Sequence, residues 1–156
     1  MDEQLADARN PADLPLGLDV VELIGLARSE SARCHHEYIG TEHLVLALSQ
    51  RDNNATPLRA LGVEWRQVYT LLDETIQRGS HPVGSGIERP FTSRARQAFS
   101  LAAAAAHELD HPRIGVPDLL VGLMRERLNI GAQVLADEGL TEERVFEFAR
   151  DSGASR

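Results

Sequence analysis

The densest group of possible metal ligands in the sequence spans nine residues. It contains His35, His36 and His43, together with Glu37 and Glu42. Imidazoles and carboxylates are common zinc ligands, but a zinc site needs a spacing that brings them together. His35 and His36 are adjacent and therefore diverge, His43 follows a predicted turn, and the H-E-x-x-H pattern is absent. We expect no metal site and interpret His36 as closing the turn after a long helix.

The sequence also lacks a constellation for nucleophilic catalysis. Cys34 is the single cysteine, so neither an intramolecular disulfide nor a cysteine metal cluster is expected. The G-x-S-x-G pattern is absent, and Ser85 lies between two glycines, where a nucleophile would be poorly positioned. No G-x-x-x-x-G-K-[ST] phosphate loop is present either. We therefore predict a non-catalytic chain that uses no cofactor.

Composition and charge limit the kinds of partner. The formal net charge of −8 repels phosphate backbones, so nucleic acid is a poor partner and a basic or amphipathic one fits better. No segment approaches the roughly 18 apolar residues of a membrane helix, and the acidic N-terminus is unlike a signal peptide. We expect a cytoplasmic protein that binds no membrane. Aromatic residues are only 4%, while Leu and Ala are abundant, which favours an all-α fold.

Proline, glycine and acidic residues divide the chain into segments. Residues 1–15 are acidic, contain two prolines and show no apolar periodicity, so we expect a flexible acidic tail. Residues 79–90 are rich in glycine, serine and proline, which predicts a linker. The folded domain at 16–150 is thus split into two halves, 16–78 and 91–150.

The two halves resemble each other, which indicates an internal repeat of about sixty residues. Seven residues of the first half recur identically 75 positions later, and three more recur 77 positions later, after a length difference in one loop. The pairs are Leu26/Leu101, Ala27/Ala102, His36/His111, Ile39/Ile114, Gly40/Gly115, Leu44/Leu119 and Leu48/Leu123, then Leu58/Leu135, Gly62/Gly139 and Val68/Val145.

Start and stop signals predict four helices in the first half. A long helix over 18–34 comes first, and Thr41 is expected to cap a second, because its hydroxyl can accept a backbone N–H. Thr56 with Pro57 is expected to open a third helix that stops at Gly62. A fourth is expected over 64–77 from the spacing of its apolar residues.

Start and stop signals predict four helices in the second half as well. Thr92 is expected to cap a helix that runs through a block of five alanines, and Pro117 to occupy the first position of the next. A third helix is predicted over 130–136, and Thr141 is expected to cap the last. Four amphipathic helices bury little alone, so the two units are expected to share a core or a tight interface.

Three segments together resemble the N-terminal repeat domain of Clp-family unfoldases, in particular the ClpC type. They are Ile-Gly-Thr-Glu-His-Leu at 39–44, preceded by His36, then Phe-Thr-Ser-Arg-Ala at 91–95, and the stretch 129–140. The resemblance covers residues 16–150. It implies two pseudo-twofold-related four-helix repeats, eight helices in all, that receive substrates or adaptor proteins for an attached ring ATPase.

No ATPase module fits within 156 residues, so the chain is either an excised domain or a stand-alone relative. Its acidic tail favours the stand-alone relative, which we expect. The leading hypothesis is a decoy that sequesters ligands of the Clp unfoldase, including phosphoarginine proteins or cyclic peptides. The alternative is an adaptor or structural partner that docks on a Clp ATPase or protease without a small ligand. The chain is expected to be a monomer or a weak dimer.

The resemblance also implies a phosphoarginine pocket in each repeat, built from a Thr at the first helix start and a Glu at the second. Helix N–H groups and a hydroxyl suit the phosphate, and a carboxylate suits the guanidinium. Repeat 1 has Glu42 but Gly17 at the Thr position, and repeat 2 has Thr92 but Pro117 at the Glu position. Each pocket is therefore expected to be half complete. The alternatives are an ordinary first-turn acid for Glu42 and an ordinary N-cap for Thr92.

The remaining candidate ligand-binding residues flank these positions. Thr41 and Arg94 neighbour Glu42 and Thr92 in the sequence. The family's apolar groove near the pseudo-twofold axis implies a contribution from Phe91 in repeat 2 and from Leu16, which replaces phenylalanine in repeat 1. A core role for Phe91 remains open.

Overall fold

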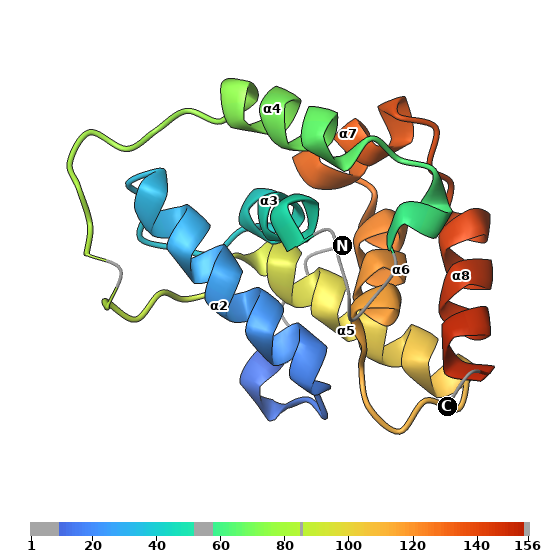
Figure 1. Ribbon diagram of the computed structural model, residues 1–156. Coiled ribbons are helices and arrows are strands. Elements are labelled where there is room, and N and C mark those ends of the chain that lie inside the picture. The colour runs from blue at the N-terminus through green and yellow to red at the C-terminus, as the bar shows by residue number, and fades with distance from the viewer. Residues whose placement is uncertain (1–9, 52–57, 85, 155–156) are drawn as a thin grey trace.

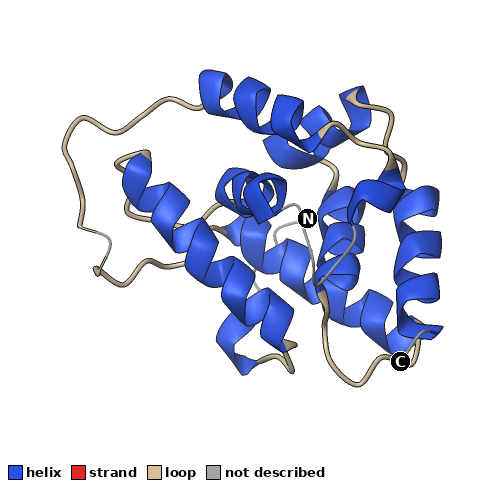
Figure 2. Cartoon of the chain, viewed as in Figure 1, coloured by secondary structure: helices blue, strands red, loops and turns tan. Residues whose placement is uncertain are grey.

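A computed structural model describes residues 10–51, 58–84 and 86–154 of the chain. The described part is helical, with two isolated bridges in place of a sheet (Figure 2). The helices of repeat 1 are α2 (Leu18–Arg33), α3 (Thr41–Arg51), the 3-10 turn η2 (Leu58–Leu61) and α4 (Trp65–Thr75). Those of repeat 2 are α5 (Ser93–Glu108), α6 (Val116–Glu126), α7 (Ile130–Asp137) and α8 (Glu142–Ala154), and a 3-10 turn η1 (Pro11–Asp13) precedes both repeats.

The two repeats follow the predicted order, with one difference in the third position. There repeat 2 has the α-helix α7, whereas the described part of repeat 1 has only the single 3-10 turn η2. This turn ends before Gly62, as expected, and Gly62 has a φ of 73°, which favours glycine. Thr56 and Pro57, predicted to open this element, lie outside the described residues.

The second helix of each repeat forms the centre of the core. Five consecutive residues of α3, Leu44 to Leu48, have no exposed surface, and the nine residues of α6 from Val116 to Met124 are all buried. A helix that is apolar all round must be surrounded by other elements. In Figure 1, α3 lies between α2 and α4, and α6 lies between α5 and α8. The two repeats therefore share one continuous hydrophobic core.

Glycine allows one particularly close helix contact in that core. A Cβ at Gly122 in α6 would collide with the carbonyl oxygen of Ala98 in α5. The absence of a side chain therefore lets the two helices of repeat 2 pack backbone against backbone.

Four threonines were predicted to cap helices; Thr56 lies outside the described residues, and two of the other three are caps. The Thr92 hydroxyl accepts the Ala95 N–H at 3.2 Å, and the Thr141 hydroxyl accepts the Arg144 N–H at 3.2 Å. The prediction for Thr41 is wrong, because Thr41 is already the first residue of α3 and is buried. Gly40 precedes the helix instead, and its N–H donates to His43 Nδ1 at 2.9 Å.

Two short parallel bridges join the repeats to each other. In one, Ile39 pairs with Phe91, and in the other Ile114 pairs with Leu16. Their hydrogen bonds match: the Thr92 N–H donates to Ile39 O at 3.0 Å, and the Gly17 N–H donates to Ile114 O at 2.9 Å. The sequence repeat relates Leu16 to Phe91 and Ile39 to Ile114, so each bridge is the counterpart of the other. The two units are thus related by a pseudo-twofold, and each bridge brings helix starts of different repeats together.

The last residues of the predicted tail contact repeat 2. Pro11 and Leu14 are buried, and the Pro15 carbonyl accepts the Ile114 N–H at 2.8 Å. Residues 1–9 lie outside the described part, so a flexible acidic tail over 1–15 stays a prediction. The bridge between Leu16 and Ile114 directly follows this segment, which explains its contacts with repeat 2.

The segment between the repeats is held by one buried arginine. Arg89 is 4% exposed, and its guanidinium donates to the carbonyls of His36, Val83, Gly84 and Ile87 at 2.9 to 3.2 Å. The long loop that leaves α4 in Figure 1 is thereby fastened to repeat 1 just before the bridge at Phe91. Within the described residues, none of the helices is both long and apolar enough to cross a bilayer.

Candidate functional site

Most of the predicted site residues meet at one place, which we call the first junction. Here a hollow of about 420 Å³ opens between the starts of α3, α5 and α7. It is lined by Thr41, Glu42, Thr92, Ser93, Arg94, Leu128, Asn129 and Ile130. Four of the six predicted ligand-binding residues are in this set.

Three helix N-termini face the hollow. Thr92 caps α5, and the Asn129 side chain caps α7 by accepting the Ala132 N–H at 2.7 Å. The first N–H groups of a helix carry a partial positive charge, so converging starts favour an anion. The first junction therefore combines anion-attracting helix starts with the Thr92 hydroxyl and the Glu42 carboxylate.

The structure corrects how the two expected pockets are assembled. Thr and Glu were paired within each repeat, but Thr92 of repeat 2 lies beside Glu42 of repeat 1, because the bridge from Ile39 to Phe91 crosses between repeats. The pairing within a repeat is therefore wrong. Instead of two half pockets, the chain has one junction with both residues and one junction with neither.

Glu42 is held over the start of its own helix. The side chain is half-buried and folds back so that a Cβ at Gly40 would collide with its carboxylate. Because Gly40 has no side chain, there is room for the Glu42 carboxylate beside the hollow. A carboxylate in this place can accept hydrogen bonds from a guanidinium.

Arg94 and Leu128 form the exposed rim of the first junction. Arg94 Nη1 lies 2.8 Å from Glu126 Oε2, and the Glu126 side chain is only 5% exposed. Glu126 Oε1 in turn accepts from Asn129 Nδ2 at 2.9 Å, so the rim arginine is tied to the cap of α7. Leu128 is 55% exposed and adds an apolar contact surface. Glu126, Leu128 and Asn129 had no sequence signal as site residues, because only the fold brings α7 to this place.

The pseudo-symmetric position, which we call the second junction, lies where α2 and α6 begin. It has Gly17 in place of Thr92 and Pro117 in place of Glu42. Asp19 Oδ2 accepts the Val116 N–H at 2.9 Å, and Asp19 Oδ1 accepts the Val20 N–H at 2.9 Å. The start of α6 is thus already capped by a carboxylate from the other repeat. Asp19 is the counterpart of Arg94 in the internal repeat, and this correspondence was the signal that could have drawn attention to it.

Phe91 and Leu16 lie next to the junctions without lining the first hollow. Both are half-buried, and Phe91 packs edge to face against Phe99 with ring centroids 5.5 Å apart. Each forms one of the two bridges between repeats. These contacts fit a packing role for Phe91, and a groove contribution of either residue stays a prediction.

The histidines are closer together than their spacing indicated. His36 and His43, expected to lie apart, have Nδ1 and Nε2 only 2.8 Å from each other, and Cys34 lies beside them. The potential ligand atoms of the three buried residues are all within 4.8 Å. The turn after α2 produces this cluster, since the backbone N–H of His36 donates to Ser31 O at 2.9 Å and so closes the turn as predicted.

Hydrogen bonds fix the protons of this cluster. Gly40 N–H donates to His43 Nδ1, so the neutral His43 ring carries its proton on Nε2 and donates to His36 Nδ1. His36 Nε2 then donates to the Gln77 carbonyl at 2.8 Å. Burial, followed by the nearby His36 and Arg89, lowers the pKa of His43 to about 3. The two histidines thus form a hydrogen-bonded relay from the Gly40 N–H to the Gln77 carbonyl.

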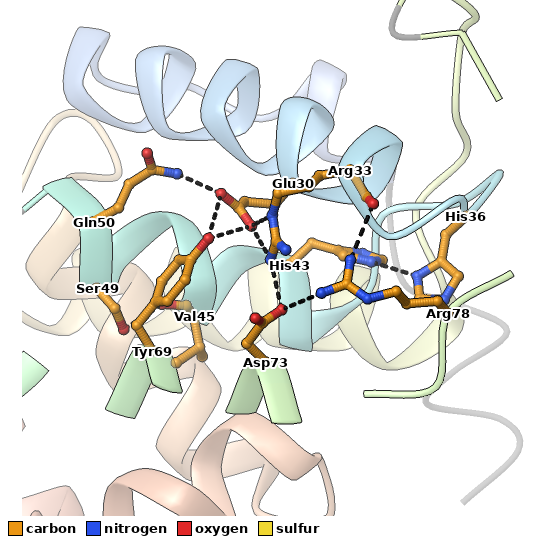
Figure 3. A network of polar contacts seen from close by, with 10 residues as sticks. All are labelled: Glu30, Arg33, His36, His43, Val45, Ser49, Gln50, Tyr69, Asp73 and Arg78. Atoms are coloured by element: carbon orange, nitrogen blue, oxygen red, sulfur yellow. Dashed lines mark hydrogen bonds and ion pairs between the residues drawn. The ribbon is translucent and has the colours of Figure 1, made fainter. Parts of the chain in front are cut away.

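A second polar network joins α2, α3 and α4 of repeat 1 (Figure 3). The buried Glu30 carboxylate accepts from Arg33 at 2.8 Å, from the Tyr69 hydroxyl at 3.0 Å and from Gln50 at 2.7 Å. Arg33 also reaches Asp73 at 2.8 Å. Burial, together with Glu30, raises the pKa of Tyr69 to about 12. Because this network ties three helices of repeat 1 together, we assign it to stability.

The described residues form a duplicated helical domain with a hollow between its repeats. The chain belongs to the Clp repeat (R) N-terminal domain family, whose pattern matches residues 18–138. It is 34% identical over 127 residues to a ClpA homolog, an ATP-binding subunit of the Clp protease, from Guillardia theta, covering 80% of this chain and 15% of that protein. It is also 34% identical to the chloroplastic chaperone ClpC1 of Arabidopsis thaliana, covering 76% of this chain and 13% of that protein. The chain thus spans about one seventh of the length of these relatives.

Solved structures show the same fold. The N-terminal domain of the chaperone ClpD from Arabidopsis thaliana superposes with a TM-score of 0.65 at 19% identity, covering 86% of this chain and 92% of that domain. The Hsp104 N-terminal domain from Candida albicans gives a TM-score of 0.70 at 12% identity, covering 90% and 93%. The all-α fold predicted from the sequence is confirmed.

Proposed function

We propose that the chain is a non-catalytic peptide- and protein-binding module, and that the first junction takes a side chain with a guanidinium and an anionic group, such as phosphoarginine. The observation that carries this proposal is the meeting of Thr92 and Glu42 at three helix starts. The Glu42 carboxylate is placed to accept from a guanidinium. The Thr92 hydroxyl and the starts of α3 and α5 are placed to bind a phosphoryl group.

The hollow favours this ligand over a simple anion or cation. A lone cation gains only Glu42, and a lone anion meets Glu42 as a repelling neighbour. A hydrogen bond to a charged group contributes about 1.5–3 kcal/mol, which corresponds to roughly one to two decades in affinity. A ligand that uses both groups gains both contributions.

The proposed role is that of a decoy in the cytoplasm, which holds ligands of a Clp unfoldase away from the ATPase. Family membership supports this role, since a domain with the receiving fold can compete for the same ligands. The second candidate is an adaptor that docks on a Clp ATPase or protease through its surface. The exposed Leu128 at the rim of the first junction favours contact with a protein over a small ligand alone.

Calorimetric titration of the chain with a phosphoarginine peptide tests the site. We expect Glu42→Gln to weaken binding by about 10- to 100-fold, because the carboxylate is lost. Glu143→Gln is the matched control, since Glu143 is an exposed acid in the first turn of α8. Equal affinities of the two variants would exclude the first junction as the binding site.

Competition distinguishes the decoy from the adaptor. A decoy lowers the degradation of a phosphoarginine substrate by a ClpC protease, and excess ligand peptide restores it. An adaptor instead co-purifies with the ATPase, and the Glu42→Gln variant co-purifies as well as the native chain does. Binding of a cyclic peptide that targets ClpC would support the decoy, and failure to bind both the cyclic peptide and phosphoarginine would remove it.

A further inference from the structure

We infer that Asp19 is an internal ligand that closes the second junction, so the chain has one open site instead of two. The inference concerns the second junction, and it rests on the proposed function only where it counts ligands bound at the first.

Asp19 takes the place of an anion between two helix starts. Its Oδ1 accepts from Val20 in the first turn of α2, and its Oδ2 accepts from Val116, the first residue of α6. The two oxygens of one carboxylate therefore bridge the N-termini of helices from different repeats. This is the geometry in which helix starts bind phosphate or carboxylate ions.

The neighbouring residues fit a filled site. A Cβ at Gly17 would lie 2.8 Å from Asp19 Oδ1, so a threonine at this position would collide with the folded-back carboxylate. Pro117, the second residue of α6, has no N–H and no carboxylate. Gly17 and Pro117 have thus lost the groups that would hold an external ligand, and Asp19 uses the Val116 N–H.

The pseudo-symmetry shows what differs at the first junction. The residue equivalent to Asp19 is Arg94, which points to Glu126 and leaves the helix starts to a ligand. The equivalents of the two donors are the N–H groups of Ala95 and Thr41, and Ala95 donates to the Thr92 hydroxyl. At the second junction a carboxylate therefore occupies both helix starts, whereas at the first junction the equivalent arginine is paired with Glu126.

Thermal unfolding in chloride and in inorganic phosphate tests the internal ligand without any peptide. Asp19→Ala should lower the melting temperature by about 2–4 °C in chloride, the usual effect of losing a helix cap in a chain of this size. Inorganic phosphate should then stabilise this variant more than it stabilises the native chain. Glu143→Ala, the control, should show neither the loss nor the extra gain. An Asp19→Ala variant that behaves like Glu143→Ala overturns the inference.

The number of phosphoarginine molecules bound separates this inference from the proposed function. The native chain should bind one, and the triple variant Gly17→Thr, Asp19→Arg, Pro117→Glu should bind two. Two molecules on the native chain, or one molecule on both the native chain and the folded triple variant, would overturn the inference. No binding to the native chain and one molecule on the triple variant would support the role of Asp19 and contradict the proposed function. If neither chain binds, the proposed function fails, and the phosphate experiment decides the inference.

Discussion

Repeat 1 and repeat 2 share one backbone plan but place different charges at equivalent positions. Their turns, bridges and helix starts correspond at the constant offset of the sequence repeat. Three equivalent pairs differ in chemistry: Glu30 and Ala105, His43 and Asp118, and Asp19 and Arg94. The backbone thus determines where polar groups meet, and the side chains determine whether they form a structural network, a relay or the proposed ligand site.

The second pair shows how the same hydrogen bond can be made with or without charge. In repeat 1 the Gly40 N–H donates to His43, and in repeat 2 the Gly115 N–H donates to Asp118 at 2.9 Å. Asp118 then contacts His111 Nδ1 at 2.9 Å, as His43 contacts His36. Burial lowers the pKa of His43, so the relay in repeat 1 should respond to acid.

The largest expected effect on stability comes from Glu30, a buried acid whose equivalent in repeat 2 is Ala105. Glu30→Ala removes the buried carboxylate that accepts from Arg33, Gln50 and the Tyr69 hydroxyl, while Arg33 keeps its contact with Asp73. We expect a loss of about 3 kcal/mol in the free energy of unfolding, measured in urea. Glu108→Ala removes a half-exposed partner of Arg125 in repeat 2 and should cost about 1 kcal/mol or less. Similar losses in the two variants would contradict the contrast between the repeats.

The next effect is a pH dependence of stability from His43. Its folded pKa of about 3 lies below the ordinary value of 6.5, so the unfolded chain binds the proton more tightly. This contribution to stability is therefore complete above pH 6.5 and is lost as the pH falls toward 3. At pH 5 the expected loss is about 2 kcal/mol, from 1.36 kcal/mol per pH unit.

The pH effect is checked by urea unfolding at several pH values. The variant His43→Asn can still accept from Gly40 but cannot take up a proton, so its stability should change less between pH 6.5 and 5. His81→Gln, an exposed histidine in the loop between the repeats, is the control. If His43→Asn keeps the pH slope of the native chain, His43 is not the source of it.

The smallest effect compares two threonine caps with the same geometry. Thr92→Ala and Thr141→Ala each remove a hydroxyl that accepts an N–H at 3.2 Å, and each should cost about 1 kcal/mol of stability. Only Thr92 lies at the first junction, so only Thr92→Ala should also weaken phosphoarginine binding. A matching loss of affinity in Thr141→Ala would show that the effect on binding comes from stability alone.

Much of the fold could be predicted from the sequence because a repeat and its helix signals are local. The constant offset between matching residues indicated the two units, and Thr92 and Thr141 marked two helix starts correctly. Thr41 was misjudged because a preceding glycine with His43 three residues later serves the same purpose as a threonine cap. The position of a cap within one turn depends on such contacts, which propensity does not describe.

The site was harder to predict, because its residues come from different repeats. Glu42 and Thr92 were both singled out, but only the bridge between Ile39 and Phe91 shows that they face one hollow. The roles of Asp19 and Glu126 depend on the same crossing. A comparison within each repeat could not reveal it, since pseudo-symmetry leaves open which repeat supplies each neighbour.

Chemical-shift mapping of the chain with phosphoarginine tests the central claim most directly. We predict that the perturbed amides cluster at residues 40–43, 92–95 and 128–130, with none at 17–20 or 115–118. Perturbations of equal size at both junctions, or perturbations that avoid the first junction, would contradict the account of one open site and one closed by Asp19.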